Sequence, residues 1–175
     1  MTRRLVLALA LTALSPLLAA CGAIPYDVSD DIPEQKVDGS PLGGLLGGFF
    51  ADNMPITIDV SEQLAKHDTS IIHSANLKSL RFDATPKGMP SGNFDFVHEI
   101  HIFVDAPSNT SLPRIEIANL APVPMSETSI DLNVVHGVDI LPYINAGAEI
   151  SATATGTAPT QDFTFTGHVV ITIHI

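Results

Sequence analysis

Histidine is the side chain in this sequence best suited to bind a transition metal, and the chain contains seven. The segment His98-Glu99-Ile100-His101 is superficially similar to a zinc-protease motif. That motif requires two histidines four residues apart on one face of a helix. Here the spacing is three residues in an alternating, strand-like segment, which places the two imidazoles on opposite faces, roughly 10 Å apart along the strand. This pair cannot chelate a single ion.

The other histidines give no stronger metal motif. His168 and His174 share one face of the last apolar segment, but six residues of strand separate them by roughly 20 Å. A site between neighbouring strands, for example His101 with His168, requires a register that the sequence does not specify. His98 alternates with apolar residues and is expected to be buried, neutral and hydrogen-bonded, unless a bulge or a strand edge relieves its burial. We therefore predict no metal site.

Oxygen ligands and nucleophiles give no recognisable motif either. Loop carboxylates and amides could converge on calcium at one end of the domain, but the chain lacks a calcium-loop spacing. No serine lies in a nucleophile elbow, and no glycine-rich phosphate loop is present. We predict no catalytic residue and no cofactor. The alternative is a hydrolase of envelope polymers or a metal-dependent protein that uses the histidines and the loop groups Asp52, Asn53, Asp105, Asn109 and Asp162.

The charge of the chain is strongly acidic. Asp and Glu number 19 against 8 Lys and Arg, a formal net charge of −11. If residues 1–20 are removed, six basic residues remain against the 19 acidic ones, and the net charge becomes −13. The electrostatic field of a domain with this negative net charge repels nucleic acid and anionic lipid head groups. Nucleic acid is therefore excluded as an expected partner.

The single cysteine of the chain follows a secretory signal. Arg3 and Arg4 precede an apolar run from Leu5 to Leu14, and small residues lie before Cys21. The apolar run is too short to span a membrane as a helix. The residues Leu18-Ala19-Ala20-Cys21 that end this segment resemble the lipobox of bacterial lipoproteins.

That resemblance implies a removed signal peptide, residues 1–20, and a Cys21 that carries fatty acyl chains such as palmitate. Gly22 rather than aspartate follows the cysteine, which implies the outer membrane. Two or more acyl chains hold a protein firmly to a bilayer, because each buried methylene contributes about 0.8 kcal/mol. With Cys21 acylated, no internal disulfide is possible, so a hydrophobic core must stabilise the domain.

Residues 21–51 have the composition of a flexible tether. They contain an acidic patch and scattered prolines, and their apolar residues follow neither the helical nor the strand periodicity for long. Leu42–Phe50 interrupts this pattern with leucines and phenylalanines among four glycines. These side chains are expected to dock on the domain itself or to contact a membrane or a partner.

From Pro55 onward apolar residues recur at every second position. Such alternation, rich in Ile, Val, Phe and Thr, is typical of half-buried antiparallel strands. Clusters of Pro, Gly, Ser and Asn separate the segments. Two short segments favour helix, Ser61–His67 and Leu141–Ala146. The predicted strands are Ile56–Val60, Leu80–Ala84, Phe94–Asp105, Ile115–Ile117, Ile130–Val135, Ile150–Thr155 and Phe163–Ile175.

Seven strands with one apolar face each must stack face to face to hide those faces from water. We therefore predict a single all-β domain over residues 52–175, an antiparallel β-sandwich with Greek-key connections that is immunoglobulin-like in the loose sense. A small closed barrel is the alternative. The expected function is a lipid-anchored cell-envelope module that binds an envelope protein or a glycan or serves a structural role.

Overall fold

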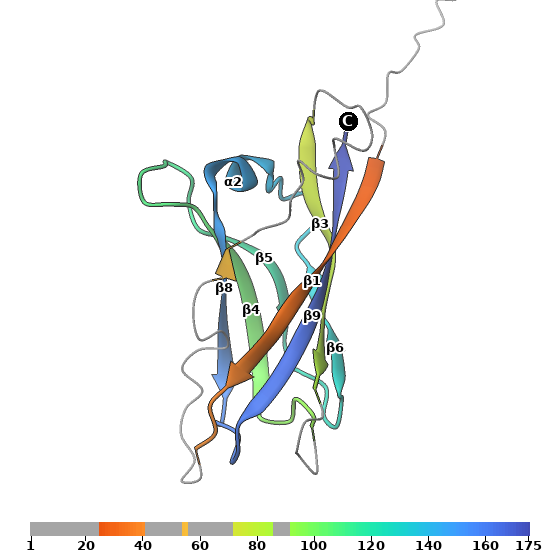
Figure 1. Cartoon of the computed structure of the whole chain (residues 1–175), viewed down its shortest axis with the longest axis vertical. Helices are drawn as coiled ribbons and strands as arrows, with labels where there is room; N and C mark the ends of the chain where they lie inside the picture. Colours follow the sequence, from red (N-terminus) through yellow and green to blue (C-terminus); the bar gives the residue numbers. More distant parts are fainter. Residues whose placement is uncertain (1–24, 41–53, 56–71, 86–91) are drawn as a thin grey trace, which may run out of the picture.

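The computed structural model describes residues 25–40, 54–55, 72–85 and 92–175, which form two antiparallel sheets packed face to face (Figure 1). The predicted all-β sandwich is therefore confirmed. Four expected features lie outside the described residues: the signal peptide, the apolar segment Leu42–Phe50, the strand Ile56–Val60 and the helix Ser61–His67.

The two sheets differ in length and number of strands. The first contains, in spatial order, β1 (Pro25–Val37), β9 (Phe163–His174), β3 (Ser74–Ala84) and β6 (Ser129–Asp131). The second contains β2 (Met54–Pro55), β8 (Glu149–Gly156), β4 (Val97–Asp105), β5 (Ile115–Leu120) and β7 (Asn133–Val134).

The strand pairs are nested along the sequence. The hairpin β4·β5 is innermost, and it is enclosed in turn by β3·β6, β2·β8 and β1·β9. Two further pairs, β3·β9 and β4·β8, bring non-consecutive strands together within each sheet. A long hairpin rolled up in this way is a jelly roll, the two-sheet arrangement of two Greek keys. The Greek-key connections are thus as predicted, with the strand order of a jelly roll rather than that of an immunoglobulin domain.

The core lies between the sheets, and the alternation of β9 shows most clearly how the sequence builds it. Phe163, Phe165, Gly167, Val169, Ile171 and Ile173 are all buried, while the residues that alternate with them are at least partly exposed. Phe165 packs edge-on against Phe82 of β3, with ring centroids 5.2 Å apart. The period-two pattern therefore predicted the inward face of β9 correctly.

The prediction of a flexible tether over residues 21–51 is wrong for residues 25–37. Those residues form β1, which pairs with β9 along its length and buries Val28, Ile32 and Val37. Lys36 near the end of β1 has its ammonium 2.8 Å from Asp162 Oδ2, and just beyond β1 the Gly39 amide donates to Asp162 Oδ1 at 3.0 Å. The domain therefore begins before Asp52. Its apolar positions escaped detection because they are four or five residues apart, separated by prolines and acids.

Local irregularities also move the predicted boundaries of other strands. β3 begins at Ser74 rather than Leu80, because a register shift between Leu77 and Ser79 interrupts the alternation. The predicted strand Ile130–Val135 divides into β6 and β7, which belong to different sheets. Between them the buried Leu132 donates its amide to Leu80 of β3 at 2.9 Å, and the chain crosses from one sheet to the other.

The predicted helix Leu141–Ala146 is confirmed as α2 (Leu141–Ala146). Pro142 stands in its first turn, where a missing amide hydrogen costs nothing, and Gly147 ends it with a left-handed backbone, φ 72°. Within the described residues, no helix has the length and apolar character needed to cross a bilayer.

Removal of β1 should prevent stable folding. Its three buried apolar side chains contribute about 5–9 kcal/mol together, at roughly 1.5–3 kcal/mol each. That is comparable to the whole stability of a typical domain, about 5–15 kcal/mol. A chain that begins at Asp52 should show no cooperative thermal transition by circular dichroism, whereas one that begins at Gly22 should. A cooperative transition in the shorter chain would contradict the assignment of β1 to the domain.

The two faces of β9 should differ in their sensitivity to truncation. Ile171→Ala removes a side chain that is 2% exposed and should lower the free energy of unfolding by about 2–5 kcal/mol. Its neighbour Val170 lies on the outward face and is only partly buried, so Val170→Ala should cost less. Urea denaturation of both variants measures the difference, and equal losses would argue against the inward face described above.

Candidate functional site

Cys21 and the other residues of the expected lipobox lie outside the described residues, so the candidate groups that the structure places are histidines and carboxylates. The expectation that His98 is buried is wrong, because its side chain is exposed. A register shift between Val97 and Glu99 in the pairing of β4 with β8 turns Val97 inward and leaves His98 outward. This β-bulge keeps the polar imidazole out of the core, as the sequence allowed for a histidine at an inward position of the alternation.

His101 and His168 do not come together. His101 lies on β4 and His168 on β9, which belong to different sheets. Each imidazole has its own carboxylate partner: His101 Nδ1 lies 2.9 Å from Glu116 Oε1, and His168 Nδ1 lies 2.7 Å from Asp31 Oδ1. The His101–His168 site considered from the sequence is therefore not formed.

The loop groups considered for calcium are also separated. Asp105 ends β4 opposite Glu149, whereas Asp162 precedes β9 at the other end of the sandwich. Asp162 is bound to Lys36 and to the Gly39 amide, while Asp105 is bound to Arg114 and Ser151. Asp52 and Asn53 lie outside the described residues, and Asn109 occupies a turn. In the part of the chain that the structure describes, no three His, Cys, Asp or Glu side chains gather as a metal site.

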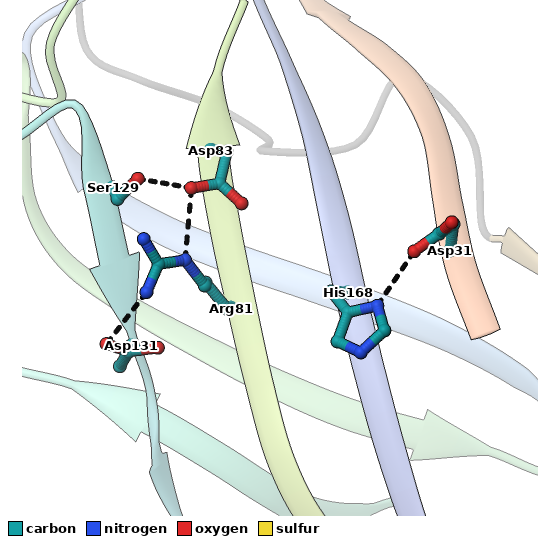
Figure 2. Close-up of polar contacts among 6 residues, drawn as sticks. All are labelled: Asp31, Arg81, Asp83, Ser129, Asp131 and His168. Atoms are coloured by element: carbon teal, nitrogen blue, oxygen red, sulfur yellow. Dashed lines mark hydrogen bonds and ion pairs between the residues drawn. The ribbon is translucent and has the colours of Figure 1, made fainter. Parts of the chain in front are cut away.

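A cross-strand row of four charged or ionisable side chains occupies the outer face of the four-stranded sheet (Figure 2). Its members are register partners from four strands, Asp31, His168, Arg81 and Asp131. Arg81 Nη1 lies 3.6 Å from Asp131, and its Nε donates to Asp83 Oδ1 at 3.0 Å. Asp31 and Asp131 are 86% and 75% exposed. Exposed pairs of this kind contribute little to stability, about 0–1 kcal/mol each.

The carboxylate of Asp83 connects this row to β6. The Ser129 hydroxyl donates to Asp83, and together with the Arg81 guanidinium it holds the pKa of Asp83 below its usual value. A carboxylate stabilised in its charged form is a poor general base. The row is therefore a set of mutually satisfied charges, which favours a role in register and solubility over catalysis.

The outer face of the five-stranded sheet carries a second polar cluster around Arg114. Its guanidinium lies 3.9 Å above the Phe103 ring and donates to the Ser151 hydroxyl at 2.9 Å, while its Nε lies 3.1 Å from Asp105. Ser151 in turn donates to Asp105 and is 7% exposed. A hydroxyl buried beneath a guanidinium and hydrogen-bonded to a paired carboxylate is not presented to a substrate, so Ser151 serves packing rather than nucleophilic attack.

Sequence reasoning did not identify these two clusters. Their members occupy the outward positions of alternating strands, which is visible in the sequence, but their partners lie up to 137 residues away. Only the strand register brings Asp31 to His168 or Arg114 to Ser151. Without a known register, each residue appears as one more solvated polar side chain.

The pH dependence of stability should reflect Glu116. Hydrogen bonds from His101 and then Asn119 hold the pKa of Glu116 below its ordinary value of 4.5. A carboxylate with a lowered folded pKa stabilises the native state above its unfolded pKa, and this contribution is lost as the pH falls through the folded pKa. The loss of stability in Glu116→Gln, measured by urea denaturation, should therefore be larger at neutral pH than below pH 4.5.

Glu99→Gln is the matched control for this titration, because Glu99 is exposed on β4. Its effect on stability should be small, as is usual for substitutions at exposed positions. If Glu116→Gln lost no more stability at neutral pH than below pH 4.5, the His101–Glu116 interaction would not contribute to folding.

No protein-family model matches this chain, and no curated protein matches it. The solved structures that resemble it include three of low sequence identity. A decameric BFDV capsid protein is 10% identical with a TM-score of 0.39, over 86% of this chain and 98% of that one. Its 60-mer form is 10% identical with a TM-score of 0.37, over 88% and 94%. The Desmodium yellow mottle tymovirus structure is 15% identical with a TM-score of 0.25, over 99% and 93%. These distant likenesses carry no inference about activity or partners.

Proposed function

We propose that the chain is a bacterial lipoprotein whose jelly-roll domain is a non-catalytic binding or structural module of the cell envelope, attached through lipid on Cys21. The lipobox Leu18–Cys21 after a positively charged and apolar segment carries this proposal. Gly22 after the cysteine favours the outer membrane. The partner class is an envelope protein or a glycan, since the net negative charge disfavours nucleic acid.

The surface chemistry of the domain supports a binding role. The polar clusters on the two outer faces consist of charges that already neutralise one another, as in Arg114–Asp105 and His168–Asp31. A catalytic pair instead needs an accessible nucleophile or acid beside a base of matched pKa. Sandwiches commonly bind partners through loops, strand edges and sheet faces, which need no such pair.

Cys21→Ala tests the lipid attachment. In cells fed a palmitate analogue, the unaltered chain should incorporate the label and sediment with outer membranes, whereas Cys21→Ala should lose the label. The variant should also retain residues 1–20, because the cleavage that the lipobox implies depends on the acylated cysteine. Mass spectrometry of both proteins measures the two effects.

Ser29→Ala is the matched control, since Ser29 is exposed on β1 and lies outside the proposed lipobox. It should be labelled and processed like the unaltered chain. Equal labelling of Cys21→Ala and the unaltered chain would refute lipid attachment at this residue.

A further inference from the structure

The distance from the proposed lipid to the folded domain is short. β1 begins at Pro25, four residues after Cys21. Four residue steps of fully extended backbone span at most about 14 Å. If Cys21 is acylated, as proposed above, the point where the chain enters the sandwich must therefore lie within that distance of the membrane surface.

The entry point belongs to one end of the sandwich, which we call the Pro25 end. Pro25 is the register partner of His174 on β9, and His174 is the partner of Ser74 on β3. The segment before α2 is attached there too, because Ile140 donates its amide to the Ala75 carbonyl at 2.8 Å. Figure 1 shows the start of β1, α2 and the carboxyl terminus at this same end. The loop between β4 and β5 reaches this end too, because the Tyr143 hydroxyl of α2 donates to the Pro113 carbonyl at 2.8 Å. The Pro25 end includes residues 25–26, 72–75, 105–114, 138–149 and 172–175.

The charges of the Pro25 end are mostly engaged within the fold. Apart from histidine, its ionised side chains are Arg114, Asp105, Asp139 and Glu149. Arg114 Nε lies 3.1 Å from Asp105, and Asp139 Oδ1 accepts the backbone amides of Ala75 and Leu141, both at 3.0 Å. The end also carries partly exposed apolar side chains: Tyr26, Ile72, Leu141, Ile144 and Ile175. Such a surface approaches lipid head groups with little electrostatic repulsion.

The flank of the sandwich is different. The exposed side of β1 carries Asp27, Asp30, Asp31 and Glu34 within eight residues. Lys36 of β1 and Lys78, which pairs with Asp27, offset only part of this negative charge. If the domain lay flat on this flank, the remaining negative charge would be repelled by an anionic head-group layer. The charge distribution therefore favours an upright orientation, in which the strands run away from the membrane.

We infer that the Pro25 end rests against the head groups of the membrane that holds the lipid and that the opposite end projects outward. This inference rests on the proposed lipidation of Cys21. β1 has 13 residues, so the opposite end stands about 40 Å further from the bilayer at roughly 3.3 Å per residue. That end carries the turn around Met125, which is 79% exposed, and the residues that join β8 to β9. Partner-binding loops are thus presented at a set height above the membrane.

The test uses the full lipidated chain in vesicles of phosphatidylethanolamine and phosphatidylglycerol that contain a lipid with a nitroxide on its head group. Since Cys21 is the only cysteine and would be acylated, one introduced cysteine can be labelled with a fluorophore. His73→Cys places the probe on an exposed residue of the Pro25 end, and Met125→Cys places it at the opposite end. Circular dichroism should show that both variants are folded.

The fluorophore at residue 73 should lose most of its emission when the nitroxide lipid is present, while that at residue 125 should keep it. Insertion of a flexible Gly-Ser segment of about twenty residues after Gly22, with a root-mean-square reach of about 25 Å, should reduce the quenching at residue 73. Quenching that is equal at the two positions, or stronger at residue 125, would overturn the inferred orientation while leaving lipidation intact. Absence of acyl mass on Cys21 would instead refute the proposed function and this inference together.

Discussion

The burial of one face of β9 is the constraint on which the rest of the structure depends. β9 pairs with β1 on one side and β3 on the other, so its backbone is hydrogen-bonded along both edges. Its inward residues, from Phe163 to Ile173, occupy the middle of the core between the sheets. Since a slip of one residue would turn the buried side chains of a paired strand outward, pairing with β9 fixes which residues of β1 and β3 face the core. The pairing of β1 with β9 is the outermost of the nested strand pairs of the jelly roll.

Bulges then decide which polar side chains reach the surface. The shift at Val97 and Glu99 turns His98 to solvent, and the shift at Leu77 and Ser79 leaves Lys78 on the outside, where it pairs with Asp27. Each bulge adds a residue to one strand and so inverts the faces beyond it. In this way a chain with imperfect alternation still keeps its charges out of the core.

The outer faces carry charge in a self-compensating form. Arg114 and Arg81 bind carboxylates from their own sheets, and His101 and His168 each have a carboxylate partner. The resulting outer faces carry charges that are locally paired within a chain of negative net charge. A fold alone does not assign a function. The function proposed here therefore depends on Cys21 and on the position of β1 four residues later.

The sequence by itself determined the all-β class, the inward face of β9 and the short helix α2, because these depend on local periodicity and on Pro142 and Gly147. It also contains the contiguous segment Leu18–Cys21, whose resemblance to a lipobox needs no tertiary structure to be seen. Tertiary structure decided that β1 is part of the domain, since Val28, Ile32 and Val37 have no strand period of their own and are buried only by pairing with β9. It likewise decided the position of His98 and the partners of Asp31, Arg81 and Arg114. The physical reason is that bulges and register arise from contacts between segments far apart in the chain, which local patterning does not record.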